Sequence, residues 1–229
     1  MAETDVRVAY RRPLWIGAGL VAAGILLAIG IVVGIGDAPF GFDQAWQDFL
    51  AASRGPVLLT FSYAMDWLGG GWFGVFALPA LIVVVLLVMR RPWAAGYFVA
   101  AEIVSVAIVQ ILKHAVGRAR PEDIIVTSDF GSFPSGHVAN AATIATALFV
   151  IFPGVWVALA GLVWTVAMAF SRTYLGAHWL SDTVGGAIIG AGAALLVAAA
   201  FAKPLATEAE RHGAVRAPEK APGHDPAPG

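Results

Sequence analysis

Long apolar runs alternate with short polar stretches along this chain. A helix needs about 20 apolar residues to cross the hydrocarbon core of a bilayer. Six segments reach or approach that length, and we predict a membrane-spanning helix for each: 14–36, 70–89, 93–116, 137–152, 155–171 and 182–202. The predicted fold is therefore all-α, a polytopic membrane protein with one six-helix bundle over residues 14–202.

The first apolar run follows Arg11 and Arg12, so a cleaved secretory signal is the alternative to a retained helix. The apolar core of a signal is about 7–15 residues long. This run is longer, and no small-x-small cleavage pattern stands out after it. We therefore expect a retained span, preceded by a short cytoplasmic segment over residues 1–13.

Residues 37–69, between the first two predicted spans, mix aromatic and apolar positions with Asp43, Asp48, Arg54 and Asp66. The mixture is typical of one or two helices lying in the membrane interface. An ordinary folded loop is the alternative, because amphipathicity alone is a weak signal. From Lys203 onward the chain turns to Pro, Ala, Gly and alternating charge, which predicts a disordered tail over 203–229.

The basic residues predict an orientation in the membrane. In a six-span layout, the start of span one and the ends of spans two and six lie on the same side of the membrane. Basic residues flank these ends, and positive charge favours the cytoplasmic side. They are Arg7, Arg11, Arg12, Arg90, Arg91, Lys203, Arg211, Arg216 and Lys220. Both termini are then cytoplasmic in a cell membrane. A smaller set falls on the outer face, and we interpret it as retained for an anion: Arg54, Lys113, Arg118, Arg120 and Arg172.

Composition agrees with a membrane protein. Only 13% of residues are charged and 59% are hydrophobic, whereas a soluble domain has about 25% charged residues. The net charge of −1 gives no bulk field for nucleic acid. The absence of cysteine excludes disulfides, thiolate nucleophiles and cysteine–zinc sites. The sequence shows no sign of an obligate protein partner, so the bilayer and a lipid substrate are the expected partners.

Three polar clusters lie at span ends on the predicted outer face: "KHAVGRARP" (113–121), "FPSGH" (133–137) and "SRTYLGAHWLSD" (171–182). Charged groups beside a membrane span are costly and suggest a function. Because three clusters far apart in the chain meet at one surface, we expect a single site.

The residue types in these clusters suit a phosphate monoester or diphosphate. Lys113, Arg120 and Arg172 offer three cations to a dianion, and arginine adds bidentate geometry. Ser135 and Gly136 precede a predicted helix, and the N–H groups at a helix N-terminus bind anions. These five residues are the predicted phosphate binders.

Hydrolysis of a phosphate ester by displacement also needs a nucleophile and an acid that protonates the leaving group. Two histidines in the clusters can fill these two roles. Asp182 follows His178 by four residues and would share a helical face with it. A carboxylate on one ring nitrogen leaves the other free to attack. This favours His178 as nucleophile through a phosphohistidine and His137 as acid. No carboxylate cluster marks a two-metal site, so we expect neither metal nor cofactor.

Other polar residues have structural interpretations. We expect Arg118 and His114 to be interfacial anchors, and Glu102 to pair within the bundle, with a place on a substrate or proton path as its alternative. Interhelical hydrogen bonds are expected from Asn140, Thr143 and Thr146, and close helix packing from the glycines of span six, namely Gly185, Gly186, Gly190 and Gly192. Three loop carboxylates either shape a headgroup pocket or are simply solvated: Glu122, Asp123 and Asp129.

The three clusters resemble the signature of the type 2 phosphatidic acid phosphatase superfamily of integral-membrane lipid phosphatases: Lys-x6-Arg-Pro, Pro-Ser-Gly-His and Ser-Arg-x5-His-x3-Asp. Every signature position is matched, over residues 113–182. The resemblance implies a six-helix bundle with an extracytoplasmic site and metal-independent dephosphorylation. It also implies the same roles for the histidines, Asp182 and the phosphate binders, and it adds most to the choice of His178 as nucleophile.

The substrate is less constrained than the chemistry. Undecaprenyl diphosphate is our preferred substrate, because an outward-facing site suits recycling of a polyprenyl carrier. Phosphatidylglycerol phosphate, phosphatidic acid and lipid A phosphates are alternatives. A lipid phosphotransferase remains open, whereas a vanadium haloperoxidase is disfavoured by six spans. A non-enzymatic lipid carrier or transporter is disfavoured because its polar groups would be expected near the bilayer midplane.

Overall fold

The computed structural model describes residues 3–35 and 38–216, and every regular element in these ranges is a helix. The prediction of an all-α fold is confirmed. The elements are, in chain order, α1 (Glu3–Gly30), η1 (Ile31–Ile35), α2 (Gly41–Ala52), α3 (Pro56–Gly69), η2 (Phe73–Ala77), α4 (Leu78–Val88), α5 (Pro92–Val116), α6 (Gly136–Ile151), α7 (Val155–Tyr174), α8 (Leu180–Ala200) and α9 (Ala202–Arg216).

Helix α8 is the centre of the bundle and packs against α1, α5, α6 and α7. The glycines of α8 make these contacts close, as predicted. An added Cβ at Gly190 would lie 2.2 Å from the carbonyl oxygen of Ala139 on α6, and one at Gly186 would lie 2.5 Å from that of Ser135. Small residues at these positions let the two backbones approach, which brings the start of α6 beside the start of α8.

Four helices of the described chain are long and apolar enough to span a membrane: Arg11–Gly34, Pro92–Val116, Val155–Tyr174 and Leu180–Ala200. A fifth candidate is the pair formed by Pro56–Gly69 and Phe73–Val88, which is bent by 48°. Helix α6 is apolar but has only 16 residues. The structure therefore supports a polytopic membrane protein with four or five such spans, and a sixth crossing by α6 stays a prediction.

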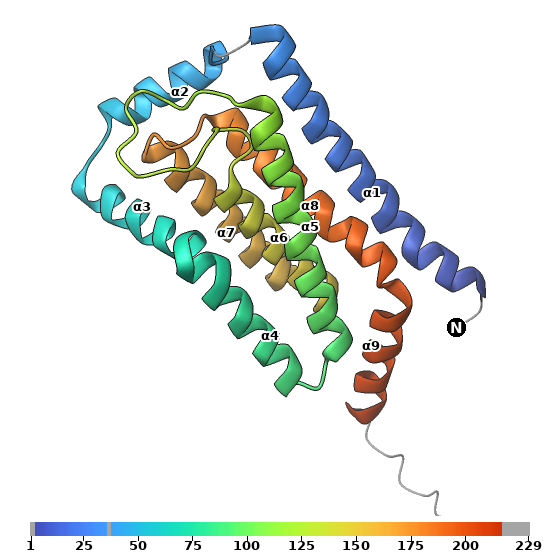
Figure 1. The fold of residues 1–229 in the computed structure, drawn as a ribbon. Helices are drawn as coiled ribbons and strands as arrows, with labels where there is room; N and C mark the ends of the chain where they lie inside the picture. Colours follow the sequence, from blue (N-terminus) through green and yellow to red (C-terminus); the bar gives the residue numbers. More distant parts are fainter. Residues whose placement is uncertain (1–2, 36–37, 217–229) are drawn as a thin grey trace, which may run out of the picture.

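Within residues 37–69 the chain forms two helices, α2 and α3, as one of the two interpretations had it, and position 37 lies outside the described residues. Helix α2 lies across one end of the bundle together with the loop between α5 and α6 (Figure 1). Helix α3 was expected in the interface, but it continues through the bend into η2 and α4 and packs against α7. Its last turn thereby faces the start of α6.

The prediction of a disordered tail from Lys203 is wrong for its first part, because α9 continues to Arg216. Glu208 is buried and accepts hydrogen bonds from the backbone N–H groups of Trp93 and Ala94, which lie in the first turn of α5. His212 on α9 contacts the carbonyl of Met89. Residues 217–229, including His224, lie outside the described residues. Helix α9 and the start of α1 lie at the end of the bundle opposite α2 (Figure 1).

Candidate active site

Lys113 lies in the last turn of α5, which ends at Gly117 in the left-handed conformation with φ of 61°. This reversal sends the following loop back over the end of the bundle. The Lys113 side chain is almost fully buried, and its Nζ donates to the carbonyl of Gly131 at 2.9 Å and to Asp129 at 3.3 Å. The lysine is thus held inside the site rather than in solvent.

Ser135 is the residue immediately before α6, as predicted, whereas Gly136 and His137 form the first turn of that helix. The Ser135 hydroxyl is fully buried and has no hydrogen-bond partner among the described residues. A buried hydroxyl without a partner costs free energy, so it suits a ligand oxygen. Helix N-termini also present free N–H groups to an anion.

His178 and Asp182 do not share a helical turn as predicted, because His178 lies in the turn before α8 and Asp182 in its first turn. Asp182 instead caps that turn by accepting from the N–H of Trp179 at 2.9 Å. Its carboxylate remains close to His178, with Oδ2 at 3.8 Å from the ring Nδ1. The nearer acceptor for Nδ1 is the carbonyl of Ser132, at 2.7 Å.

These contacts determine the protonation of the His178 ring. The Ser132 carbonyl can only accept, so Nδ1 carries the proton, and Arg120 Nη1, which can only donate, lies 3.3 Å from Nε2. Burial, and after it the charges of three nearby cations, lowers the pKa of His178 well below its ordinary value. The ring is therefore neutral near pH 7, with its lone pair on Nε2. The three cations are Arg172, Arg120 and Lys113.

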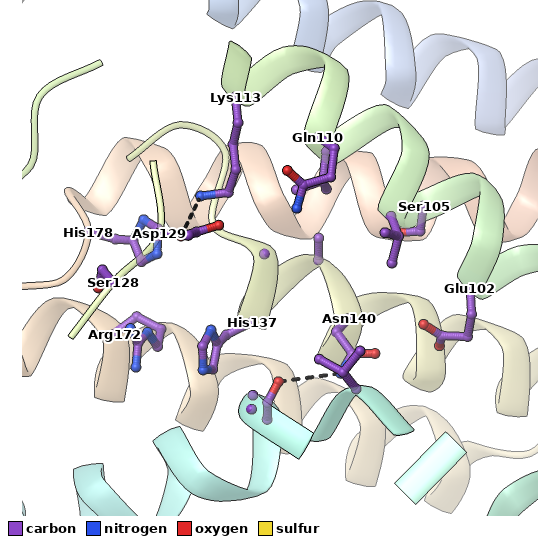
Figure 2. Close-up of a pocket in the computed structure, with 18 of the residues that line it drawn as sticks. Glu102, Ser105, Gln110, Lys113, Ser128, Asp129, His137, Asn140, Arg172 and His178 are labelled. Carbon is purple, nitrogen blue, oxygen red and sulfur yellow. Dashed lines mark hydrogen bonds and ion pairs between the residues drawn. The ribbon is translucent and has the colours of Figure 1, made fainter. Parts of the chain in front are cut away.

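A cavity of about 730 Å³ collects most of the predicted residues. Its lining includes both histidines and two of the cations, together with the start of α6: His137, His178, Lys113, Arg172 and Gly136. Figure 2 shows the side chains of Lys113, His137, Arg172 and His178 around the end of the cavity next to Asp129. Arg120 joins them through its contact with His178, while Ser135 and Asp182 lie buried beside them.

Arg118 is not an interfacial anchor. Its side chain is fully buried and donates to Asp182 at 2.6 Å and to Asp43 at 2.8 Å. Asp43 also accepts from the N–H and the hydroxyl of Ser181. The residue expected at the interface thus neutralises the carboxylate behind the predicted nucleophile. A buried carboxylate requires such a partner, but nothing in the sequence pairs positions so far apart.

Asp66, on α3, is the residue that sequence reasoning missed. Its Oδ1 lies 3.2 Å from Nε2 of His137 and forms an ion pair with Arg172. A carboxylate at this nitrogen stabilises the protonated ring, which is the form that an acid catalyst needs. Gly70, directly after α3, lies against the same histidine ring, because a Cβ added to it would lie 2.0 Å from Nε2 of His137. The only sequence signal was an acidic residue within an aromatic-rich helix.

The outer cations are not all free for an anion. Arg54 binds Asp123, which also accepts from Gln47, so Asp123 fastens the loop to the α2 region. Asp129, in contrast, bridges Lys113 and Arg120 at the cavity. Burial alone would raise the pKa of Asp129, but these two cations outweigh it and lower that pKa. Asp129 and Asp66 therefore occupy the cations that a phosphate would use.

Within residues 3–35 and 38–216, no three His, Asp or Glu side chains form a group suited to a metal ion. The expectation of metal-independent chemistry stays a prediction.

A family model described as "PAP2 superfamily" matches residues 94–205, in agreement with the resemblance of the three motifs. The lipid A 1-phosphatase of Rhizobium johnstonii is 32% identical over 123 residues, covering 48% of this chain and 49% of that protein. The chain thus spans about half the length of this relative. The decaprenylphosphoryl-5-phosphoribose phosphatase of Mycolicibacterium smegmatis is 33% identical over 159 residues, 66% of this chain and 83% of that protein.

Among solved structures, the fold is similar to that of a transmembrane PAP2 type phosphatidylglycerolphosphate phosphatase from Bacillus subtilis. The TM-score is 0.68 at 26% identity, and the match covers 79% of this chain and 93% of the other.

Proposed function

Because the chain belongs to the PAP2 superfamily, we propose that it is a membrane phosphatase that removes phosphate from a lipid phosphate or diphosphate. The observation that carries this proposal is the His178 ring. Its Nδ1–H donates a hydrogen bond to the Ser132 carbonyl, and its Nε2 lies beside the Arg120 guanidinium. A neutral imidazole with its lone pair next to cations is suited to attack phosphorus.

The phosphate group enters by replacing two carboxylates. Asp129 now bridges Lys113 and Arg120, and Asp66 binds Arg172. A phosphate dianion offers more charge and more acceptor oxygens than either carboxylate, so it competes for the same donors. The Ser135 hydroxyl, which has no partner among the described residues, donates a hydrogen bond to a further phosphate oxygen.

In the first step, Nε2 of His178 forms a bond to phosphorus while the bond from phosphorus to the lipid oxygen breaks. His137 gives its Nε2 proton to the departing oxygen, and Asp66 at 3.2 Å stabilises the protonated form of that ring before transfer. Asp182, 3.8 Å from Nδ1, stabilises the positive charge that His178 gains as a phosphohistidine.

In the second step, a water oxygen attacks phosphorus and the phosphorus–nitrogen bond breaks. The electron pair returns to Nε2 of His178, and His137 accepts the proton that the water loses. Inorganic phosphate and the lipid product leave, and both histidines regain their starting states. An acceptor lipid in place of water would make the protein a phosphotransferase.

Undecaprenyl diphosphate is the proposed substrate, at a site on the extracytoplasmic face. Two features support it: the mostly apolar cavity walls beyond the histidines, and the relative named for a decaprenylphosphoryl compound. Phosphatidylglycerol phosphate, phosphatidic acid and lipid A phosphates are the alternatives. The placement of basic residues supports the orientation, with both termini in the cytoplasm.

The test is phosphate release by the purified protein in detergent with excess chelator. Undecaprenyl diphosphate, phosphatidylglycerol phosphate and phosphatidic acid are compared, and the preferred lipid has the highest kcat/KM. His178→Ala and His178→Gln should abolish release, whereas His114→Ala, at an exposed histidine of α5, should retain it. Release that persists in both His178 variants, or that stops with chelator, would overturn the mechanism. If the protein is a hydrolase, a reaction in ¹⁸O-labelled water should release inorganic phosphate that carries the ¹⁸O label.

A further inference from the structure

Asp43 and Glu102 are two carboxylates that the proposed mechanism does not use, and their surroundings differ. Glu102 lines the cavity, and its Oε1 is buried without a hydrogen-bond partner among the described residues, so the expectation that it pairs within the bundle is wrong. Asp43 is fully buried, and both of its carboxylate oxygens accept hydrogen bonds. Burying a carboxylate is costly even with partners, so the place of Asp43 beside the active site suggests a function.

Helix α2 carries Asp43 to the active site because its polar residues face inward. Its buried positions are Asp43, Gln47 and Leu50, whereas Phe42 and Phe49 are exposed. This arrangement is the reverse of an amphipathic helix on a soluble protein, whose charged residues face outward. Helix α2 lies across the end of the bundle where α8 begins (Figure 1). Asp43 therefore points into the protein, toward the start of α8.

Asp43 contacts the first turn of α8, directly after the turn that holds His178. Its Oδ1 accepts a hydrogen bond from the N–H of Ser181 at 2.8 Å, and its Oδ2 accepts one from the Ser181 hydroxyl at 2.6 Å. The same Oδ2 binds Nη2 of Arg118 at 2.8 Å, and Nη1 of that guanidinium binds Asp182 at 2.6 Å. Asp43, Arg118 and Asp182 form a charged row that ends 3.8 Å from Nδ1 of His178.

The charged row holds one cation and two carboxylates, so it carries one net negative charge. If Arg118 were paired with Asp182 alone, the cation would cancel most of the charge that Asp182 presents to His178. Because Asp43 takes the other arm of the guanidinium, a net negative charge remains behind the ring. The side chains of all three residues are fully buried, so salt and solvent screen this charge little.

We propose that Asp43 is a positioning residue that acts through Arg118 and Asp182 to stabilise the charge that His178 gains as a phosphohistidine. The inference rests on the proposed function, because it concerns the covalent step at His178. In that step Nε2 forms a bond to phosphorus, the bond to the lipid oxygen breaks and Nδ1 keeps its proton, so the ring becomes positively charged. A negative charge behind the ring favours formation of the phosphohistidine and opposes its breakdown, in which the ring loses that charge.

The experiment measures the two steps separately. The value of kcat/KM for undecaprenyl diphosphate, or for the lipid that the phosphate-release assay prefers, reports formation of the phosphohistidine. Its breakdown is followed by loading the protein with the same lipid labelled with ³²P in its terminal phosphate, chasing with unlabelled lipid and quenching in alkali. Asp43→Asn keeps the shape of the side chain and removes its charge. We expect kcat/KM to fall roughly tenfold, on the scale of one unit charge in a protein interior, and breakdown to be as fast as in the wild type or faster.

Ser181→Ala is the matched control, because it removes the hydrogen bonds of the Ser181 hydroxyl to Asp43 and Arg118 but leaves the charge of the row unchanged. It should lower kcat/KM much less than Asp43→Asn does. Asp43→Glu keeps the charge and should retain most of kcat/KM. Thermal unfolding in detergent shows whether each variant folds. If Asp43→Asn does not fold, Asp43→Glu decides: retained kcat/KM supports the inference, and a loss of the size expected for Asp43→Asn overturns it.

A general loosening of the active site would slow both steps. Equal slowing of formation and breakdown in Asp43→Asn would therefore overturn the inference, as would a loss in Ser181→Ala as large as that in Asp43→Asn. Unchanged kcat/KM in Asp43→Asn, beside a wild-type protein that releases phosphate, would overturn this inference alone. No phosphate release by the wild type from any of the lipids would instead count against the proposed function itself.

Discussion

Arg118 and Asp182 form a fully buried ion pair behind the predicted nucleophile, with 2.6 Å between Nη1 and Oδ1. The other arm of the same guanidinium binds Asp43 of α2 at 2.8 Å. One arginine therefore balances two buried carboxylates and joins α2 to the start of α8. The turn that holds His178 lies between these elements and the loop that carries Ser132.

Replacing Arg118 with Met should destabilise the protein strongly, because two buried carboxylates lose their cation. Breaking a buried pair costs about 3–5 kcal/mol, whereas an exposed pair contributes under about 1 kcal/mol. Thermal unfolding in detergent measures the difference. Arg54→Met, at the partly exposed pair with Asp123, is the matched control and should shift Tm far less. Equal shifts in the two variants would contradict the central position of Arg118.

Asp66→Asn should weaken acid catalysis by His137. The amide does not stabilise a protonated ring as a carboxylate does, so we expect kcat for a lipid phosphate to fall by about 10²-fold. A substrate that needs no proton on its leaving group, such as p-nitrophenyl phosphate, should lose much less. The ratio of the two rates is the measurement. A loss of the same size for both substrates would instead place Asp66 in binding, through Arg172.

Asp129→Asn should strengthen the binding of phosphate-like inhibitors. The carboxylate of Asp129 occupies Lys113 and Arg120, and these cations lower its pKa below the ordinary value of 3.8, so it stays ionised at every practical assay pH. Its removal frees both donors. We expect the inhibition constant for vanadate to fall by roughly three- to tenfold, on the scale of one charge-assisted hydrogen bond. Glu122→Gln on the same loop is the control, and a weaker vanadate affinity in Asp129→Asn would refute the competition.

The depressed pKa of His178 predicts how stability depends on pH. In the unfolded chain this ring takes up a proton as pH falls through about 6.5, but the folded protein resists protonation because of burial and nearby cations. The unfolded state then binds more protons, so stability falls as pH drops below 6.5 and is unaffected by this group above it. Tm of the wild type, compared with His178→Gln between pH 7.5 and 5, measures the effect.

If the difference in Tm between wild type and His178→Gln is the same across that range, the ring titrates normally. The same lowering of the pKa should appear in the pH dependence of activity, since the neutral ring of His178 is the proposed nucleophile. The acid limb of kcat/KM that belongs to His178 should lie well below pH 6.5.

The apolar runs determined the helices of this protein, because chain segments of that length and hydropathy satisfy their backbone within a membrane only as helices. The three motifs determined which residues meet, since their order and spacing place Lys113, His137 and His178 at the ends of helices. The glycines of α8 determined the close contact with α6. These features depend on local sequence, so they could be predicted from it.

Tertiary structure decided the partners of the buried charges. Arg118 lies 64 residues from Asp182 and 75 from Asp43, and Asp66 lies 106 residues from Arg172. The partner of His178 Nδ1 is a backbone carbonyl, which any residue at position 132 would provide. Pairing over such distances depends on how the helices pack, and a carbonyl has no signature in the sequence. For the same reason the chain alone could not tell whether Glu102 has a partner or faces a cavity.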